Sequence, residues 1–197
     1  MLAPTTADSG VARFLRSRGE GLHHICFESD DVVREVRRYL GTGVDMIDAK
    51  PREGLAGQVA FVHPRSCAKL LVELATPSAP ASLPETPLAL WAVHGKVADV
   101  GAAAQRFQDL FGMSRGFAPE DGSFVQLSLA GLMVQLTSLG GGFSKPALTA
   151  LRLRTKDLPV LARRLGARGI RCQEHAVGLV VAPGPGQGAL LMVESGR

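Results

Sequence analysis

GEGLHHICFESDD, residues 19–31, is the stretch that decides how the rest of the chain is interpreted. Its centre alternates between apolar and polar side chains, as expected of a strand with one face on a core. Ile25 and Phe27 would occupy the core face, while His24 and Glu28 would point the other way. An aspartate suited to cap a helix ends the stretch, and apolar residues then recur at helical spacing. The stretch therefore predicts a strand that leads directly into an amphipathic helix.

LLVEL, residues 70–74, is expected to be a second strand of the same kind. Alternation places its three even-numbered residues on the apolar face and Glu73 on the opposite one. A His and a Glu on the non-core faces of two strands suit a divalent metal ion with open coordination positions. His24 and Glu73 are therefore candidate metal ligands, and a complete site needs further ligands besides these two.

The composition is that of an ordinary globular protein. Of its 197 residues, 46% are hydrophobic and 20% are charged, and the net charge is +4. The basic residues are scattered and have no aromatic residues interleaved with them, so the sequence does not predict a nucleic-acid partner. A small anionic substrate suits this charge equally well.

Cysteine usage and the N-terminus predict the compartment. The three cysteines, Cys26, Cys67 and Cys172, lack C-x-x-C spacing, which favours reduced thiols. The first ten residues show no signal-peptide pattern, and no apolar run reaches membrane-spanning length. We therefore expect a cytoplasmic protein without a membrane partner.

The strand–helix–strands order occurs three times along the chain. Asp31, Asp99 and Asp157 each follow a strand and are placed to cap a helix, and further short strands follow each helix. The sequence thus predicts an α+β fold of three tandem βαβββ units with mixed sheets. Within them we expect turns at residues 51–54 and 183–186, and strands at 25–29, 44–47, 59–63, 70–74, 90–97, 124–129, 132–136, 148–154, 178–182 and 189–193.

A Pro- and Ser-rich segment at residues 76–87 lacks apolar periodicity and predicts a linker. It divides the chain into a half domain at residues 1–75 and a second domain at 88–197, made of the last two units. Alignment of the units compares the positions of His24 and Glu73. The second unit has Ala92 and Gln135 there, and the third has Ala150 and Glu194.

Several motifs of the first unit resemble a known family. They are FLRSRGEGLHHI at 14–25, ID at 47–48 with PR at 51–52, GQVAFVHPRS at 57–66 and LVEL at 71–74. Together they resemble the C-terminal half of methylmalonyl-CoA epimerase, in the vicinal oxygen chelate superfamily (glyoxalase, bleomycin resistance proteins and dioxygenases). The resemblance covers about the first 75 residues. It implies a glyoxalase-like fold, in which βαβββ units pair into cupped sheets.

The resemblance also implies a chemistry. His24 and Glu73 would bind a divalent ion of the Co, Mn, Zn, Ni or Mg class, and Glu73 would also act on the substrate. Such an ion polarises a thioester carbonyl, so that a carboxylate can remove the neighbouring proton. The substrate would be an acyl-CoA or another small anion, and Arg52, Arg65 and Lys69 could attract its phosphates.

The family's N-terminal half, which supplies further metal ligands, is not found ahead of Met1. Three routes to a complete site stay open. Gln135 and His94 of the second unit could join the pair, a second copy of the chain could supply another His24 and Glu73 in a homodimer, or a longer gene product could carry the missing half.

The leading functional prediction is a metal-dependent isomerase that abstracts a proton next to a thioester carbonyl. One alternative is a degenerate glyoxalase-fold protein that binds a small ligand without metal in its second domain, where Arg152 would pair with Glu194. Another is a lyase or dioxygenase that shares the fold but not the substrate.

Overall fold

The computed structural model describes residues 3–78, 88–182 and 188–196. The greater part of the expected linker at 76–87 and the expected turn at 183–186 lie outside these residues. A short helix, α1 (Gly10–Arg18), precedes the first repeat. Along the described chain, no helix combines the length and the apolar character needed to cross a membrane.

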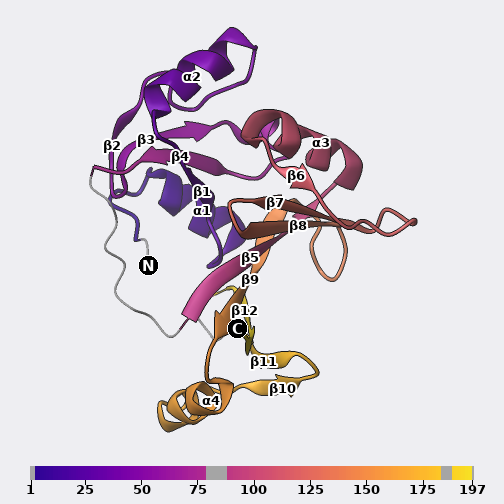
Figure 1. Cartoon of the computed structure of the whole chain (residues 1–197). Helices are drawn as coiled ribbons and strands as arrows, with labels where there is room; N and C mark the ends of the chain where they lie inside the picture. Colours follow the sequence, from indigo (N-terminus) through magenta and orange to yellow (C-terminus); the bar gives the residue numbers. More distant parts are fainter. Residues whose placement is uncertain (1–2, 79–87, 183–187, 197) are drawn as a thin grey trace. The chain divides into compact units, whose positions relative to one another are not determined.

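All three βαβββ repeats predicted from the sequence are present (Figure 1). The first consists of β1 (Ile25–Glu28), α2 (Val32–Gly41), β2 (Arg52–Gly54), β3 (Gly57–Val62) and β4 (Val72–Thr76), with the 3-10 turn η1 (Pro64–Ser66) between the last two strands. The second consists of β5 (Leu88–Val97), α3 (Val100–Phe111), β6 (Ser114–Arg115), β7 (Phe124–Leu129) and β8 (Leu132–Ser138). The third consists of β9 (Ala147–Thr155), α4 (Leu158–Ala167), β10 (Gln173–His175), β11 (Gly178–Val181) and β12 (Leu190–Ser195).

The three predicted helix caps are confirmed in the same form. The carboxylates of Asp31, Asp99 and Asp157 each accept a hydrogen bond of 2.9 Å from the backbone N–H three residues later. Each cap fixes where a helix starts relative to the strand before it. The repeats can therefore be compared position by position from these aspartates.

Strand direction makes the sheets mixed. In the first repeat the order is β1-β4-β3-β2, with β1 parallel to β4 and the other neighbours antiparallel. The third repeat has the corresponding order β9-β12-β11-β10, again with its first and last strands parallel. A parallel pair at this position requires a crossover, and the helix of each repeat supplies it.

Some expected boundaries were wrong. Residues 52–54, expected as a turn, form the edge strand β2, whereas the segment expected as a strand at 44–47 contributes only an isolated bridge from Met46 to Val62. The two- and three-residue strands β6 and β10 were not predicted, because strands that short show no periodicity. On α2, Tyr39 is buried, while Leu40, which follows Val32 and Val36 at helical spacing, is 46% exposed.

The chain forms two compact units. One contains residues 24–78 and 95–147, that is, the first repeat and most of the second. The other contains residues 3–23, 88–94, 148–182 and 188–196, with α1 and the third repeat. β5 contributes residues 88–94 to the second of these units and residues 95–97 to the first.

The core of the first compact unit joins the first two repeats. The buried Tyr39 hydroxyl donates a 2.6 Å hydrogen bond to the carbonyl oxygen of Leu110 at the end of α3. The Phe27 ring of β1 packs on Phe111, with ring centroids 4.9 Å apart. Because Phe27 faces this core, the alternate residues of β1 point to the other face of the sheet.

Candidate metal and proton-transfer site

His24 and Glu73 meet across the first and last strands of the first repeat. The parallel register places Cys26 of β1 opposite Glu73 of β4, and the Ile25 N–H bonds to the Leu71 carbonyl. This register brings the Nε2 atom of His24 to 3.0 Å from an Oε atom of Glu73. Their side chains are only 19% and 13% exposed, so the pair is largely shielded from water.

The Glu73 carboxylate is held in its ionised form. The hydrogen bond with His24 is the largest cause that keeps the pKa of Glu73 below its usual range, and partial burial opposes it. The charge of His24, a hydrogen bond from the Cys26 thiol and the charge of Arg52 act in the same direction as that bond. An ionised carboxylate is the form that can bind a cation or accept a proton.

The separation of the two side chains fits one shared divalent ion. Nitrogen and oxygen ligands bind such ions at about 2.0–2.2 Å, so two neighbouring ligand atoms of an octahedral site lie about 3 Å apart. The observed 3.0 Å between Nε2 and the carboxylate oxygen matches this spacing. Within the described ranges, no group of three or more His, Cys, Asp or Glu residues converges to complete such a site.

Phe61 and Arg52 lie beside the His24–Glu73 pair. The Phe61 ring on β3 meets the His24 imidazole edge-on, with ring centroids 5.3 Å apart. The Arg52 guanidinium lies 5.6 Å from the centroid of the Phe61 ring and is 3.3 Å from a carboxylate oxygen of Asp48. Asp48 also accepts a 2.9 Å hydrogen bond from the Phe61 N–H, so it fixes both residues. Sequence reasoning missed Asp48 and Phe61 as site residues, although both lie in motifs of the family resemblance.

A cleft of about 510 Å³ opens on the same side of the first repeat. Its volume falls within the range that encloses small-molecule ligands. The lining residues come from β1, from the β2–β3 hairpin and from the end of β4: Cys26, Glu28, Gly54, Leu55, Ala56, Gly57, Ala75, Pro77 and Ser78.

Two residues of this lining show how it is built. Gly57 has a φ of 108°, and a Cβ there would collide with the carbonyl oxygen of Thr76, so the hairpin can approach β4 only with glycine. Partial burial and the neighbouring Glu73 carboxylate raise the pKa of the Cys26 thiol to about 12. Cys26 is therefore a neutral donor in the cleft wall and not a thiolate nucleophile.

Arg65 and Lys69, predicted to attract phosphates, lie at the other end of the strands. They belong to the η1 turn and the loop after it, which connect the end of β3 to the start of β4. Arg65 is 3.4 Å from a carboxylate oxygen of Asp45, and both side chains are largely exposed. Of the three predicted cations, only Arg52 lies beside the His24–Glu73 pair.

Gln135 and His94, the candidate ligands of the second repeat, belong to different compact units. Gln135 lies on β8 opposite Gln126 of β7, in the same unit as His24. His94 lies on β5 in the other unit, where its Nε2 atom is buried without a hydrogen-bond partner. Burial is the largest cause that lowers the pKa of His94, followed by the charge of Arg152.

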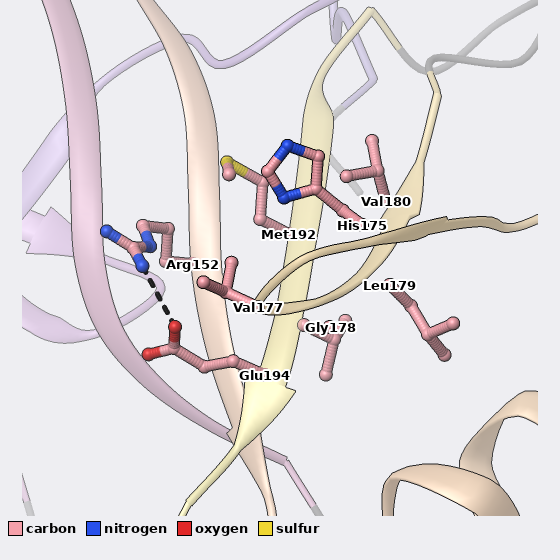
Figure 2. A pocket seen from close by; sticks show the side chains of 9 residues that line it. Arg152, His175, Val177, Gly178, Leu179, Val180, Met192 and Glu194 are labelled. Atoms are coloured by element: carbon pink, nitrogen blue, oxygen red, sulfur yellow. Dashed lines mark hydrogen bonds and ion pairs between the residues drawn. The ribbon is translucent and has the colours of Figure 1, made fainter.

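The third repeat carries the predicted ion pair in place of a His–Glu pair. Arg152 donates a 2.9 Å hydrogen bond to Glu194, and both line a pocket with His175 and Met192 (Figure 2). The pocket measures about 10 Å³, which is room for about one water molecule and not for a substrate. The guanidinium groups of Arg152 and Arg154 lie 4.3 and 4.1 Å from the Trp91 ring centroid, which further fixes the pair.

The observed register corrects the sequence alignment of this repeat. β9 and β12 pair Arg152 with Met192 and Arg154 with Glu194. Counting back from the capping aspartates, Arg152 corresponds to Cys26, whose partner is Glu73. Met192 therefore takes the position of Glu73, and Glu194 lies two residues further along.

Comparison with known proteins agrees with this picture. Residues 1–62 match the model of the Glyoxalase/Bleomycin resistance protein/Dioxygenase superfamily. Mitochondrial methylmalonyl-CoA epimerase of Dictyostelium discoideum is 40% identical over 76 residues, which is 38% of this chain and 46% of that protein. The human enzyme of the same name is 34% identical over 76 residues, 38% of this chain and 43% of that protein. The chain thus spans about half the length of the curated relatives it matches.

Over nearly the whole chain, the fold matches that of a 4-hydroxymandelate synthase variant from Streptomyces coelicolor. The TM-score is 0.69 at 18% identity, and the match covers 98% of this chain and 75% of that one. The α+β fold of tandem βαβββ repeats is therefore shared with a known protein. The resemblance predicted from the sequence is confirmed: residues 1–62 carry the pattern of the Glyoxalase/Bleomycin resistance protein/Dioxygenase superfamily, and about 76 residues are related to part of methylmalonyl-CoA epimerase.

Proposed function

We propose that this chain acts as a metal-dependent isomerase of the methylmalonyl-CoA epimerase type, which moves the proton on the carbon next to a thioester carbonyl. The carrying observation is the 3.0 Å contact between His24 and Glu73, on the side of the first repeat that holds the 510 Å³ cleft. The partial similarity to methylmalonyl-CoA epimerase, over 76 residues, supports the choice of reaction.

In this proposal, His24 and Glu73 hold the ion, and a bound divalent ion supplies Lewis acidity toward the thioester carbonyl. Glu73 takes the proton from the neighbouring carbon, because its carboxylate is ionised and lies beside the cleft. The Cys26 thiol donates to Glu73 and so orients its oxygen atoms. The Phe61 ring packs against His24, and the Arg52 guanidinium lies near that ring.

The remaining ligands come, in this proposal, from a second copy of the chain. Two His24 and two Glu73 around a twofold axis would give two imidazoles and two carboxylates, and closed homodimers are the commonest oligomers. Gln135, in the same compact unit, is the alternative donor from within one chain. Analytical ultracentrifugation with and without metal tests this step: a protein that stays monomeric with metal bound contradicts the dimeric site.

The proposed substrate is an acyl-CoA, and the proposed compartment is the cytoplasm. Arg52 stands beside the cleft side of the first repeat, while Arg65 and Lys69 occupy the exposed turn at the other ends of β3 and β4. An elongated substrate that reaches both regions would place its phosphates at the turn. Replacing Arg65 and Lys69 by Ala should then raise KM for the CoA ester and leave kcat nearly unchanged.

The decisive experiment combines metal analysis with exchange of solvent deuterium into methylmalonyl-CoA. The wild-type protein should bind a divalent ion and exchange the proton, and His24→Ala should lose both. Glu194→Gln, a change in the last strand of the third repeat, serves as the control that keeps both. An intact protein with neither metal nor exchange would refute the isomerase and favour a metal-free binding protein.

A further inference from the structure

Leu55 lies at the tip of the β2–β3 hairpin and points into water. Its side chain is 98% exposed, the highest value among the large hydrophobic residues of the described ranges. The hairpin closes through a two-residue loop, Leu55 and Ala56, because Gly54 pairs with Gly57 in the antiparallel register. Exposure of a leucine to water is unfavourable. The core of the first repeat therefore does not account for a leucine at this position.

The geometry of the loop does not require a leucine either. Two-residue hairpin loops favour Asn, Asp and Gly, which adopt a positive φ or hydrogen-bond to their own backbone. Here the positive φ, 108°, falls on Gly57 and not on Leu55 or Ala56. A polar residue would thus serve the loop as well as Leu55 does, so the apolar side chain has a role outside the turn.

Two glycines fix the hairpin tip beside the cleft. A Cβ at Gly54 would collide with the Val59 side chain, and a Cβ at Gly57 would collide with the carbonyl oxygen of Thr76. The apolar side chains of the cleft lining are Leu55, Ala56, Ala75 and Pro77. A leucine held at a fixed position among other apolar groups is prepared for contact with a ligand.

The charges of the cleft indicate which part of a substrate it takes. Among the described residues no Lys, Arg or His belongs to the lining, and its one charged side chain is Glu28. Such surroundings disfavour phosphates and carboxylates and favour an uncharged chain. Cys26 lines the cleft, and its thiol donates to the Glu73 carboxylate. A chain attached to the reacting carbon can therefore extend from Glu73 into the cleft.

We propose that Leu55 is a specificity-determining residue that contacts an alkyl chain of the substrate in this cleft. The inference rests on the proposed function and narrows it to acyl-CoA esters whose acyl group carries an uncharged chain of several carbons. The cleft of about 510 Å³ has room for such a chain beyond the reacting carbon. Contact between the chain and Leu55 removes apolar surface of both from water, which favours binding in proportion to the area buried.

Binding of S-alkyl thioethers of CoA, with chains of two, four and six carbons, to the full-length protein tests this contact. These compounds have no thioester carbonyl and no acidic proton, so calorimetry measures binding without the reaction. In the wild-type protein Kd should fall about fourfold for each added CH₂ group. Leu55→Ser should reduce this dependence to about twofold or less, whereas Leu55→Met should keep it.

Val177→Ser is the matched control. Val177 belongs to the two-residue loop of the β10–β11 hairpin in the third repeat, beside the space of about 10 Å³. This variant should keep the wild-type dependence on chain length. Wild-type protein that binds none of the thioethers, or binds all three equally, overturns the inference, and so does an unchanged dependence in Leu55→Ser. A clear dependence in a wild-type protein that exchanges no deuterium into methylmalonyl-CoA would instead refute the proposed isomerase and retain Leu55 as a contact for alkyl chains.

Discussion

The first and third repeats place two different side-chain pairs on the same structural framework. In each, the first strand runs parallel to the last, and a side chain from one reaches a glutamate on the other at 3.0 or 2.9 Å. The first repeat pairs a histidine with Glu73, and the third pairs an arginine with Glu194. A neutral imidazole can bind a metal ion, whereas a guanidinium keeps its charge and only neutralises its partner.

The two pairs also differ in the space beside them. The His24–Glu73 pair lies on the side of its repeat that opens into a 510 Å³ cleft, while the Arg152–Glu194 pair lines a space of about 10 Å³. Arg154 and Trp91 add further contacts to the second pair. This fold therefore repeats its backbone with different side chains: the first repeat has a His–Glu pair on the side of an open cleft, and the third has an Arg–Glu pair beside a space of about one water molecule.

The largest expected effect comes from breaking the first pair. Glu73→Gln removes the charge and the proton acceptor, and we expect proton exchange to fall by about 10²- to 10⁴-fold. The measurement is deuterium incorporation by mass spectrometry. Glu194→Gln makes the same chemical change in the third repeat and should leave the rate unchanged. Equal losses in the two variants would show that the repeats do not differ in chemistry.

A core substitution should lower the free energy of unfolding more in the compact unit of the first repeat than in that of the third. Phe107 of α3 is fully buried against Phe111, which also contacts Phe27 and Tyr39 of the first repeat. Phe107→Ala should lower the free energy of unfolding by about 3–5 kcal/mol. Leu161→Ala in α4, where Leu161 is 9% exposed, should cost about 2 kcal/mol. Urea unfolding followed by circular dichroism measures both, and a greater loss in the α4 variant would contradict the ranking.

The Arg152–Glu194 pair can be tested as a structural element. Arg152→Met leaves the partly buried Glu194 carboxylate paired with Arg154 alone among the described residues, and should lower stability by about 1–2 kcal/mol. Arg152→Met combined with Glu194→Met removes both charges and should recover most of the loss. Thermal unfolding gives the comparison. A double variant less stable than the single one would show that the glutamate has a role apart from the arginine.

The smallest expected effect comes from removing the hydrogen bond between Tyr39 of the first repeat and the end of α3. Tyr39→Phe removes the hydroxyl that donates to the Leu110 carbonyl and should lower stability by about 1 kcal/mol. Arg38 also donates to that carbonyl, at 3.0 Å, so the oxygen keeps a partner and the loss stays small. A loss above 3 kcal/mol in denaturant unfolding would show that the hydroxyl carries more of the packing than its single bond.

Local signals account for the parts of the site that could be predicted. The period-two pattern of β1 predicted His24 on the face away from Ile25 and Phe27. The capping aspartates predicted where the helices begin. The pairing of β1 with β4 could not be read from either strand, because it depends on residues nearly fifty positions apart. The alignment of Glu194 with Glu73 failed for the same reason, since only the register shows that Met192 takes that place.

By itself, the sequence determined the three βαβββ repeats, their capped helices and the two residues of the candidate metal pair, because periodicity and capping act over a few residues. The tertiary structure alone decided that His24 and Glu73 lie 3.0 Å apart, that Arg52 and Phe61 flank them, and that Glu28 faces a cleft. These features arise where strands distant in the chain meet. Their positions are set by hydrogen-bond register and packing, which no local pattern encodes.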